Sequence, residues 1–197
     1  MEQTTTAQGE LGDRMPPNCE VLEIHIGQLN QLFNAMDPAP FRQRDLDPNA
    51  EEFIVGWARE LRSDGPIGLT VHLDRKAGTA EEAAMLKDAV HEFFVERANQ
   101  TRQRLRQILR VGRTSLLIGL VFLTASIVMS DQLGSRTSAG HFSGVIRESL
   151  LIGGWVAMWK PIEVFLYDWW PILAEARLLD RLGRMSVKVV QSSKPIA

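Results

Sequence analysis

TRQRLRQILRVGRTSLLIGLVFLTASIVMS, residues 101–130, is the stretch that decides how the rest of the chain is interpreted. Its second part, Thr114 to Ser130, contains no formal charge. At about 1.5 Å per residue this run covers roughly 26 Å, close to the hydrocarbon thickness of about 30 Å in a bilayer. The sequence therefore predicts a first transmembrane helix over 114–130. The alternative is a long core helix of a soluble protein, which would normally interrupt such a run with a polar face.

Basic side chains lead directly into the apolar run and predict its orientation. Lys and Arg next to a spanning helix stay on the cytoplasmic side and are attracted to anionic headgroups. We therefore expect a basic juxtamembrane helix over 101–113, placement in the cell inner membrane and both termini in the cytoplasm. The orienting residues are Arg102, Arg104, Arg106, Arg110 and Arg113.

Charge is divided unequally along the 197 residues. Residues 1–100 carry 9 basic and 18 acidic side chains, whereas residues 101–197 carry 13 basic and 6 acidic ones. An acidic first half is typical of a water-soluble module. The basic residues of the second half flank apolar runs and form no recognisable nucleic-acid motif, so we expect a lipid bilayer and not nucleic acid as a partner.

Cys19 is the only cysteine, so the chain cannot form an intramolecular disulfide or a zinc site built from thiolates. The first eighteen residues are polar and lack the apolar core of a secretory signal. We interpret residues 1–18 as a disordered tail.

Residues 19–100 are predicted to form a small α/β domain of the order β-α-α-β-α. Two segments alternate between apolar and polar residues as strands do, Glu20–Ile26 and Ile67–Leu73. Between them we expect a short helix over 29–36 and a second helix that begins at Pro48, with Asp47 as its N-cap and an apolar stripe that includes Phe53.

The third helix of this domain is expected to begin at Thr79, which with Glu82 forms a capping box. No proline or glycine interrupts it before residue 110, so it should continue into the first transmembrane helix. The predicted fold class is thus α/β plus a two-helix transmembrane hairpin, predominantly helical overall. A two-stranded sheet has two open edges, which favours a homo-oligomer or a larger membrane complex.

The second apolar run is shorter, because only eleven uncharged residues separate Glu148 from Lys160. A spanning helix over 149–170 must include Lys160 and Glu163, which can pair on one face while Lys160 snorkels towards the headgroups. Trp169 and Trp170 would then lie in the interfacial belt. The alternatives are an ion or proton relay through the two charges, and a re-entrant segment broken at Pro161.

Small residues recur at helical spacing in both runs and predict close helix packing. Between the runs we expect a short external loop over 131–148, and after them a cytoplasmic amphipathic helix and polar tail over 171–197. The packing residues are Gly112, Ser115 and Gly119 in the first helix, and Ser149, Gly153 and Ala157 in the second.

Polar residues of the two expected strands form one candidate metal site. If the strands are neighbours, Glu23, His25, His72 and Asp74 would converge, and such nitrogen and oxygen ligands suit zinc or manganese. A solvated sheet face explains the same residues. The sequence contains no phosphate loop, nucleophile elbow or metalloprotease motif, so we expect no enzyme activity and no cofactor.

Taken together, these patterns favour a non-enzymatic two-pass membrane protein that acts as an anchor or assembly subunit through its cytoplasmic domain. A small channel or transport accessory subunit that uses Lys160 and Glu163 is the first alternative. A membrane-tethered domain that binds a metal or ligand is the second.

Overall fold

The computed structural model describes residues 10–39, 44–61, 65–73, 80–136 and 141–191. The chain is mostly helical and divides into two compact units. The first, called here the sheet unit, comprises residues 1–99 and 175–197; the second, called the helical unit, comprises residues 100–174.

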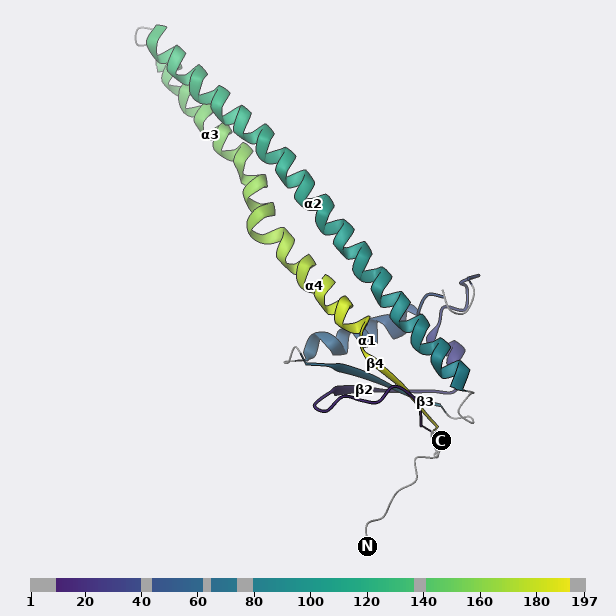
Figure 1. The fold of residues 1–197 in the computed structure, drawn as a ribbon. Helices are drawn as coiled ribbons and strands as arrows, with labels where there is room; N and C mark the ends of the chain where they lie inside the picture. Colours follow the sequence, from purple (N-terminus) through teal and green to yellow (C-terminus); the bar gives the residue numbers. More distant parts are fainter. Residues whose placement is uncertain (1–9, 40–43, 62–64, 74–79, 137–140, 192–197) are drawn as a thin grey trace. The chain divides into compact units, whose positions relative to one another are not determined.

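The described elements follow one another in an order that places strands at both ends of the chain (Figure 1). They are β1 Glu10–Gly12, β2 Glu20–Ile26, the 3-10 turn η1 Leu29–Leu32, α1 Pro48–Glu60, β3 Ile67–Leu73, α2 Ala80–Arg136, α3 His141–Glu163, the π-helical turn η3 Val164–Asp168, α4 Trp169–Leu182 and β4 Ser186–Gln191.

Four strands form one mixed sheet in the order β1-β4-β3-β2. β2 and β4 both pair with β3 in parallel, and β1 pairs with β4 antiparallel. The two strands predicted from alternation agree with β2 and β3. The predicted polar tail is wrong at 186–191, because Val187 and Val189 alternate inward and are buried in a central strand.

The predicted disordered tail is likewise wrong at its end, where Glu10–Gly12 form β1 along the edge of β4. Asp13 then forms an ion pair with Lys87 of α2, in which Nζ of Lys87 lies 2.7 Å from Oδ1 of Asp13, and this pair fixes the segment to the sheet unit. The predicted β-α-α-β-α order therefore lacks two strands that the chain supplies from its ends.

The core of the sheet unit lies between one face of the sheet and the helices that cover it. In Figure 1, α1 and the first turns of α2 lie on the same side of the strands. Inward side chains alternate with more exposed ones along the edge strand β2, whereas all residues of the central strand β3 except His72 are buried. The buried residues include Leu22, Leu69, Val71, Val187 and Val189 from strands, and Ile54, Leu86, Val90, Phe94 and Leu182 from helices.

Helix α1 begins where its sequence signals predict. Asp47 accepts a hydrogen bond from the backbone N–H of Asn49 at 2.9 Å, and Pro48 occupies the first helical position. Phe53 is exposed, which corrects its place in the predicted stripe. The predicted helix over 29–36 is only one turn, because Phe33 leaves the turn in an extended conformation and bridges to Leu46.

Helix α2 is one uninterrupted helix, as predicted from the lack of proline and glycine before residue 110. It continues to Arg136 and α3 begins at His141, so most of the predicted loop 131–148 is helical. Thr79, the predicted N-cap, lies outside the described residues. The π-helical turn η3 follows Pro161, whose ring removes a backbone N–H from the helix.

Candidate functional site

Two histidines meet on the outer face of the sheet, the face opposite the helices. His25 of β2 and His72 of β3 are direct partners in the parallel register. Directly paired side chains on neighbouring strands stand about 5 Å apart, which explains why the two imidazole rings stack with centroids 4.4 Å apart and an interplanar angle of 13°.

Glu23 completes this cluster because it lies two residues before His25, on the same face of β2. Its Oε2 is 3.6 Å from Nε2 of His72. One ligand atom from each of the three residues lies within 4.8 Å of the others. The structure thus brings together three of the four residues that the sequence named, whereas Asp74 lies outside the described residues.

Nε2 of His72 is the least satisfied atom of the cluster. It is buried from solvent and has no hydrogen-bond partner among the described residues, although the whole side chain is 20% exposed. Glu23 lies on the side of the cluster that faces solvent, and 62% of its side chain is exposed. The site is therefore closed towards the sheet and open towards solvent.

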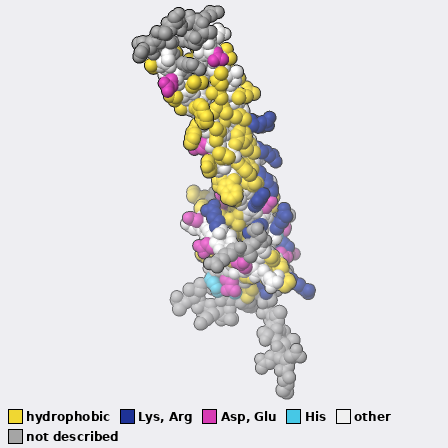
Figure 2. Space-filling view, turned by 90° about the vertical axis from the view of Figure 1, so that its left-hand side faces the viewer, with side chains coloured by type: hydrophobic (Ala, Val, Ile, Leu, Met, Phe, Trp, Pro, Cys, Tyr) yellow, Lys and Arg dark blue, Asp and Glu magenta, His cyan; other side chains and the backbone are white. Residues whose placement is uncertain are grey.

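The helical unit carries a different kind of candidate surface. Two helical stretches, within Glu81–Gln132 and Gly144–Leu182, are long and apolar enough to cross a membrane. Only 17% of the apolar window in each stretch is buried, unlike a core helix of a soluble protein. Large side chains such as Leu117, Val121, Trp155 and Trp159 point outward, and hydrophobic side chains cover the surface there (Figure 2).

Small residues let the two apolar helices approach each other on their inner faces. A Cβ atom placed on Gly119 would lie 3.1 Å from the backbone carbonyl oxygen of Ala157. Gly112 faces Val164 and Gly154 faces Leu123 in the same way. Ser115, Gly153 and Ala157 are partly buried as well.

Ser149 is the exception among the predicted packing residues, because it is exposed. The tight position of α3 is Gly154, one residue beyond the predicted Gly153. The i, i+4 spacing of Ser149, Gly153 and Ala157 fits one helix face but does not determine which of two adjacent glycines faces the neighbouring helix.

The two charges of the second apolar run pair with each other. Nζ of Lys160 lies 3.0 Å from Oε2 of Glu163, one helical turn along the same face. Their side chains are 68% and 42% exposed, so the pair is open to the surface of the helical unit.

An open groove of about 580 Å³ borders this pair within the helical unit. Polar groups of both helices line it, including Arg104, Lys160, Tyr167 and Asp168, together with Ile108 and Val111. Of the five arginines named from the sequence, Arg104, Arg106, Arg110 and Arg113 are exposed and Arg102 is partly buried.

Aromatic residues follow the charged pair in η3 and α4. Tyr167 and Trp170 are each 69% exposed. Trp169 is partly buried and its indole Nε1 donates to the backbone carbonyl of Phe165 at 2.8 Å.

Thr124 of α2 likewise donates to the carbonyl of Leu120 at 2.8 Å. The polar groups of Trp169 and Thr124 are thus both satisfied by the backbone of their own helical segment.

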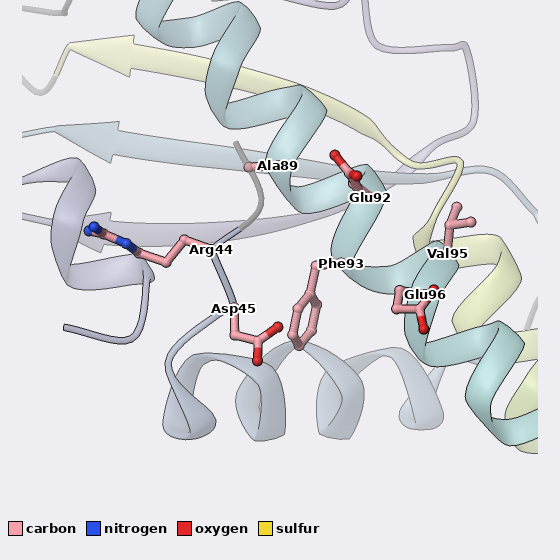
Figure 3. A pocket seen from close by; sticks show the side chains of 7 residues that line it. All are labelled: Arg44, Asp45, Ala89, Glu92, Phe93, Val95 and Glu96. Atoms are coloured by element: carbon pink, nitrogen blue, oxygen red, sulfur yellow. The ribbon is translucent and has the colours of Figure 1, made fainter. Parts of the chain in front are cut away.

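A further pocket of about 390 Å³ lies in the sheet unit, between the segment before α1 and the first part of α2. No motif in the sequence predicts this pocket. Its carboxylates, those of Asp45, Glu92 and Glu96, are spread around Phe93 and do not gather at one point (Figure 3). The side chain of Arg44 points away from the others.

The segment that brings Asp45 to this pocket is fixed by Asp37. The carboxylate of Asp37 accepts hydrogen bonds from the backbone N–H groups of Asp45 and Ala39 at 2.8 and 2.9 Å, and these bonds lower its pKa. The pocket therefore has a defined wall, but its polar groups do not converge as a ligand set.

Comparisons with protein-family models, curated proteins and solved structures find no match to this chain.

Proposed function

We propose that this protein is a two-pass membrane anchor whose sheet unit lies in the cytoplasm and serves as an assembly subunit. The proposal depends mainly on the position of β4 in the sheet. This strand follows both apolar helices in the sequence, yet it pairs with β3, which precedes them. A chain that returns to its own sheet must end on the side of the membrane from which it left.

This return favours a hairpin over a re-entrant second segment. A hairpin crosses twice and brings the chain back, whereas a single crossing followed by a re-entrant segment would separate β4 from β3 by the bilayer. The outward apolar side chains of α2 and α3 support lipid contact, and the inward glycines support packing of the two helices.

The charges support the orientation. The five arginines Arg102 to Arg113 precede the uncharged run of α2, and such residues stay cytoplasmic. Lys160 and Glu163 neutralise each other at 3.0 Å on the exposed surface. Their pairing favours anchoring at the interface over an ion or proton relay, which needs groups that face a path through the bilayer.

Recruitment or self-association by the sheet unit is supported by the sheet topology. β2 is a terminal strand of seven residues, and terminal strands present backbone groups that can pair with another chain. We propose a homo-oligomer or a larger membrane complex. The detergent-solubilised protein should have a defined mass above that of one 22.1 kDa chain, whereas a monomer with no partner would contradict the assembly role.

Labelling of single cysteines tests the orientation. In a Cys19→Ser background, Asp131→Cys should react with a membrane-impermeant maleimide in intact cells, because Asp131 follows the apolar run. Asn99→Cys and Arg184→Cys, both at exposed positions, should react only after permeabilisation. Labelling of Arg184→Cys from outside would contradict the hairpin, and labelling of Asn99→Cys from outside would contradict the orientation.

A further inference from the structure

We propose that Glu23, His25 and His72 form a binding site for a divalent first-row transition-metal ion, with Zn²⁺ as the preferred ion. The site lies on the outer face of β2 and β3. It does not depend on the membrane anchor, because all three residues belong to the sheet unit.

The backbone register provides the first argument. His25 and His72 are direct partners, and Glu23 lies two residues from His25 on the same face. Strand pairing thus places three ligand side chains on rigid elements at fixed spacing. A site built on paired strands needs only side-chain rotation to close on an ion.

The distances provide the second argument. The 3.6 Å between Oε2 of Glu23 and Nε2 of His72 is too long for a hydrogen bond. Two ligands of a tetrahedral zinc ion, with Zn–N and Zn–O bonds of about 2.0–2.2 Å, stand about 3.4 Å apart. The observed separation is therefore close to the edge of a zinc coordination polyhedron.

The unsatisfied nitrogen of His72 provides the third argument. Buried side-chain nitrogens normally have a partner, and each exception requires an explanation. Nε2 of His72 is buried without a hydrogen bond among the described residues, and it lies on the side of the ring that faces Glu23. A metal ion between the two groups would satisfy both.

The donor set defines the class of ion. Two imidazoles and one carboxylate suit Zn²⁺ and its neighbours in the first transition row, whereas Mg²⁺ and Ca²⁺ prefer oxygen ligands alone. Three protein ligands leave one position of a tetrahedral ion open. The exposure of Glu23 places that position towards solvent, where a water molecule or an external ligand can occupy it.

Titration of the untagged full-length protein in detergent with Co²⁺, followed by competition with Zn²⁺, tests the site. Visible absorption of protein-bound Co²⁺ should saturate at one ion per chain, and Zn²⁺ should displace it. His25→Ala and Glu23→Gln should each weaken binding by at least about a hundredfold, since even loss of an outer-shell partner costs tenfold to a hundredfold. His72→Ala should do the same.

Lys188→Gln is the matched control, because Lys188 lies on the same face of the sheet opposite Thr70 and is not a ligand. It should bind Co²⁺ like the natural chain. Circular dichroism checks the fold of each variant, and the exposed His25 and Glu23 keep the test valid if His72→Ala does not fold. Absence of saturable Co²⁺ binding, or binding that survives His25→Ala and Glu23→Gln, would overturn the proposal.

Discussion

At the scale of single residues, the burial of β4 side chains contributes to the stability of the sheet unit. Val187 and Val189 are 1% and 2% exposed and belong to the core cluster, whereas Val190 faces the other side of the strand and is half-buried. Burial of a valine side chain contributes about 1.5–3 kcal/mol. Neighbouring valines of one strand should therefore differ in their effect on stability.

Val189→Ala should lower the free energy of unfolding of the sheet unit by about 1–3 kcal/mol, because it removes buried methyl groups and leaves a cavity. Val190→Ala is the control and should change it by less than about 0.5–1 kcal/mol. Chemical denaturation followed by circular dichroism measures both. Equal effects of the two substitutions would contradict the observed inward and outward faces of β4.

The histidine cluster shows what residue patterns determine and what they do not. Alternation in Glu20–Ile26 and Ile67–Leu73 places Glu23, His25 and His72 on polar faces. Alternation does not specify the neighbour, direction or offset of a strand, and a shift by one residue moves a side chain to the opposite face. The sequence therefore predicts which residues could form the cluster. The pairing of His25 with His72 follows only from the observed register of β2 and β3.

At the scale of elements, Gly119 makes a close contact between α2 and α3. A Cβ at Gly112 or Gly154 would lie 2.7 Å from a side-chain carbon of Val164 or Leu123. A Cβ at Gly119 would meet a backbone carbonyl oxygen at 3.1 Å, which cannot move without the helix. Larger residues at Gly119 must consequently separate the two helices.

Gly119→Val should destabilise the packed helix pair by about 1–3 kcal/mol, the usual cost of overpacking. Ala125→Val adds methyl groups to an exposed position of the same helix and should be nearly neutral. Reversible unfolding in bicelles, or the fraction of cross-linked α2–α3 pairs, measures the difference. If Gly119→Val were as stable as Ala125→Val, the inner face assigned to Gly119 would be wrong.

The elements differ in how well their sequences predict them. α1, β2, β3 and the continuous α2 carry strong signals, such as the cap at Asp47 and the absence of helix breakers before residue 110. β1 and β4 are short and follow polar or Gly-rich stretches. Each is stable only through pairing with distant strands, which no local pattern records.

At the scale of the whole molecule, the helical unit is an insertion between β3 and β4. The two ends of the inserted segment enter and leave one sheet unit, so the sheet requires residues from both sides of the apolar helices. The sequence predicted the apolar helices and the acidic domain before them. It did not predict that β4 completes the domain after the second helix. In the sequence, a strand of only six residues near polar residues resembles part of a polar tail.

The proposed function requires that lipid surrounds the outward faces of α2 and α3. Alkaline carbonate extraction of membranes from cells that express the full-length protein tests it most directly, with antibody detection of the pellet and the supernatant. The protein should remain in the membrane pellet and be released only by detergent. Recovery of folded, monodisperse protein from the detergent-free supernatant would show that lipid does not surround these helices.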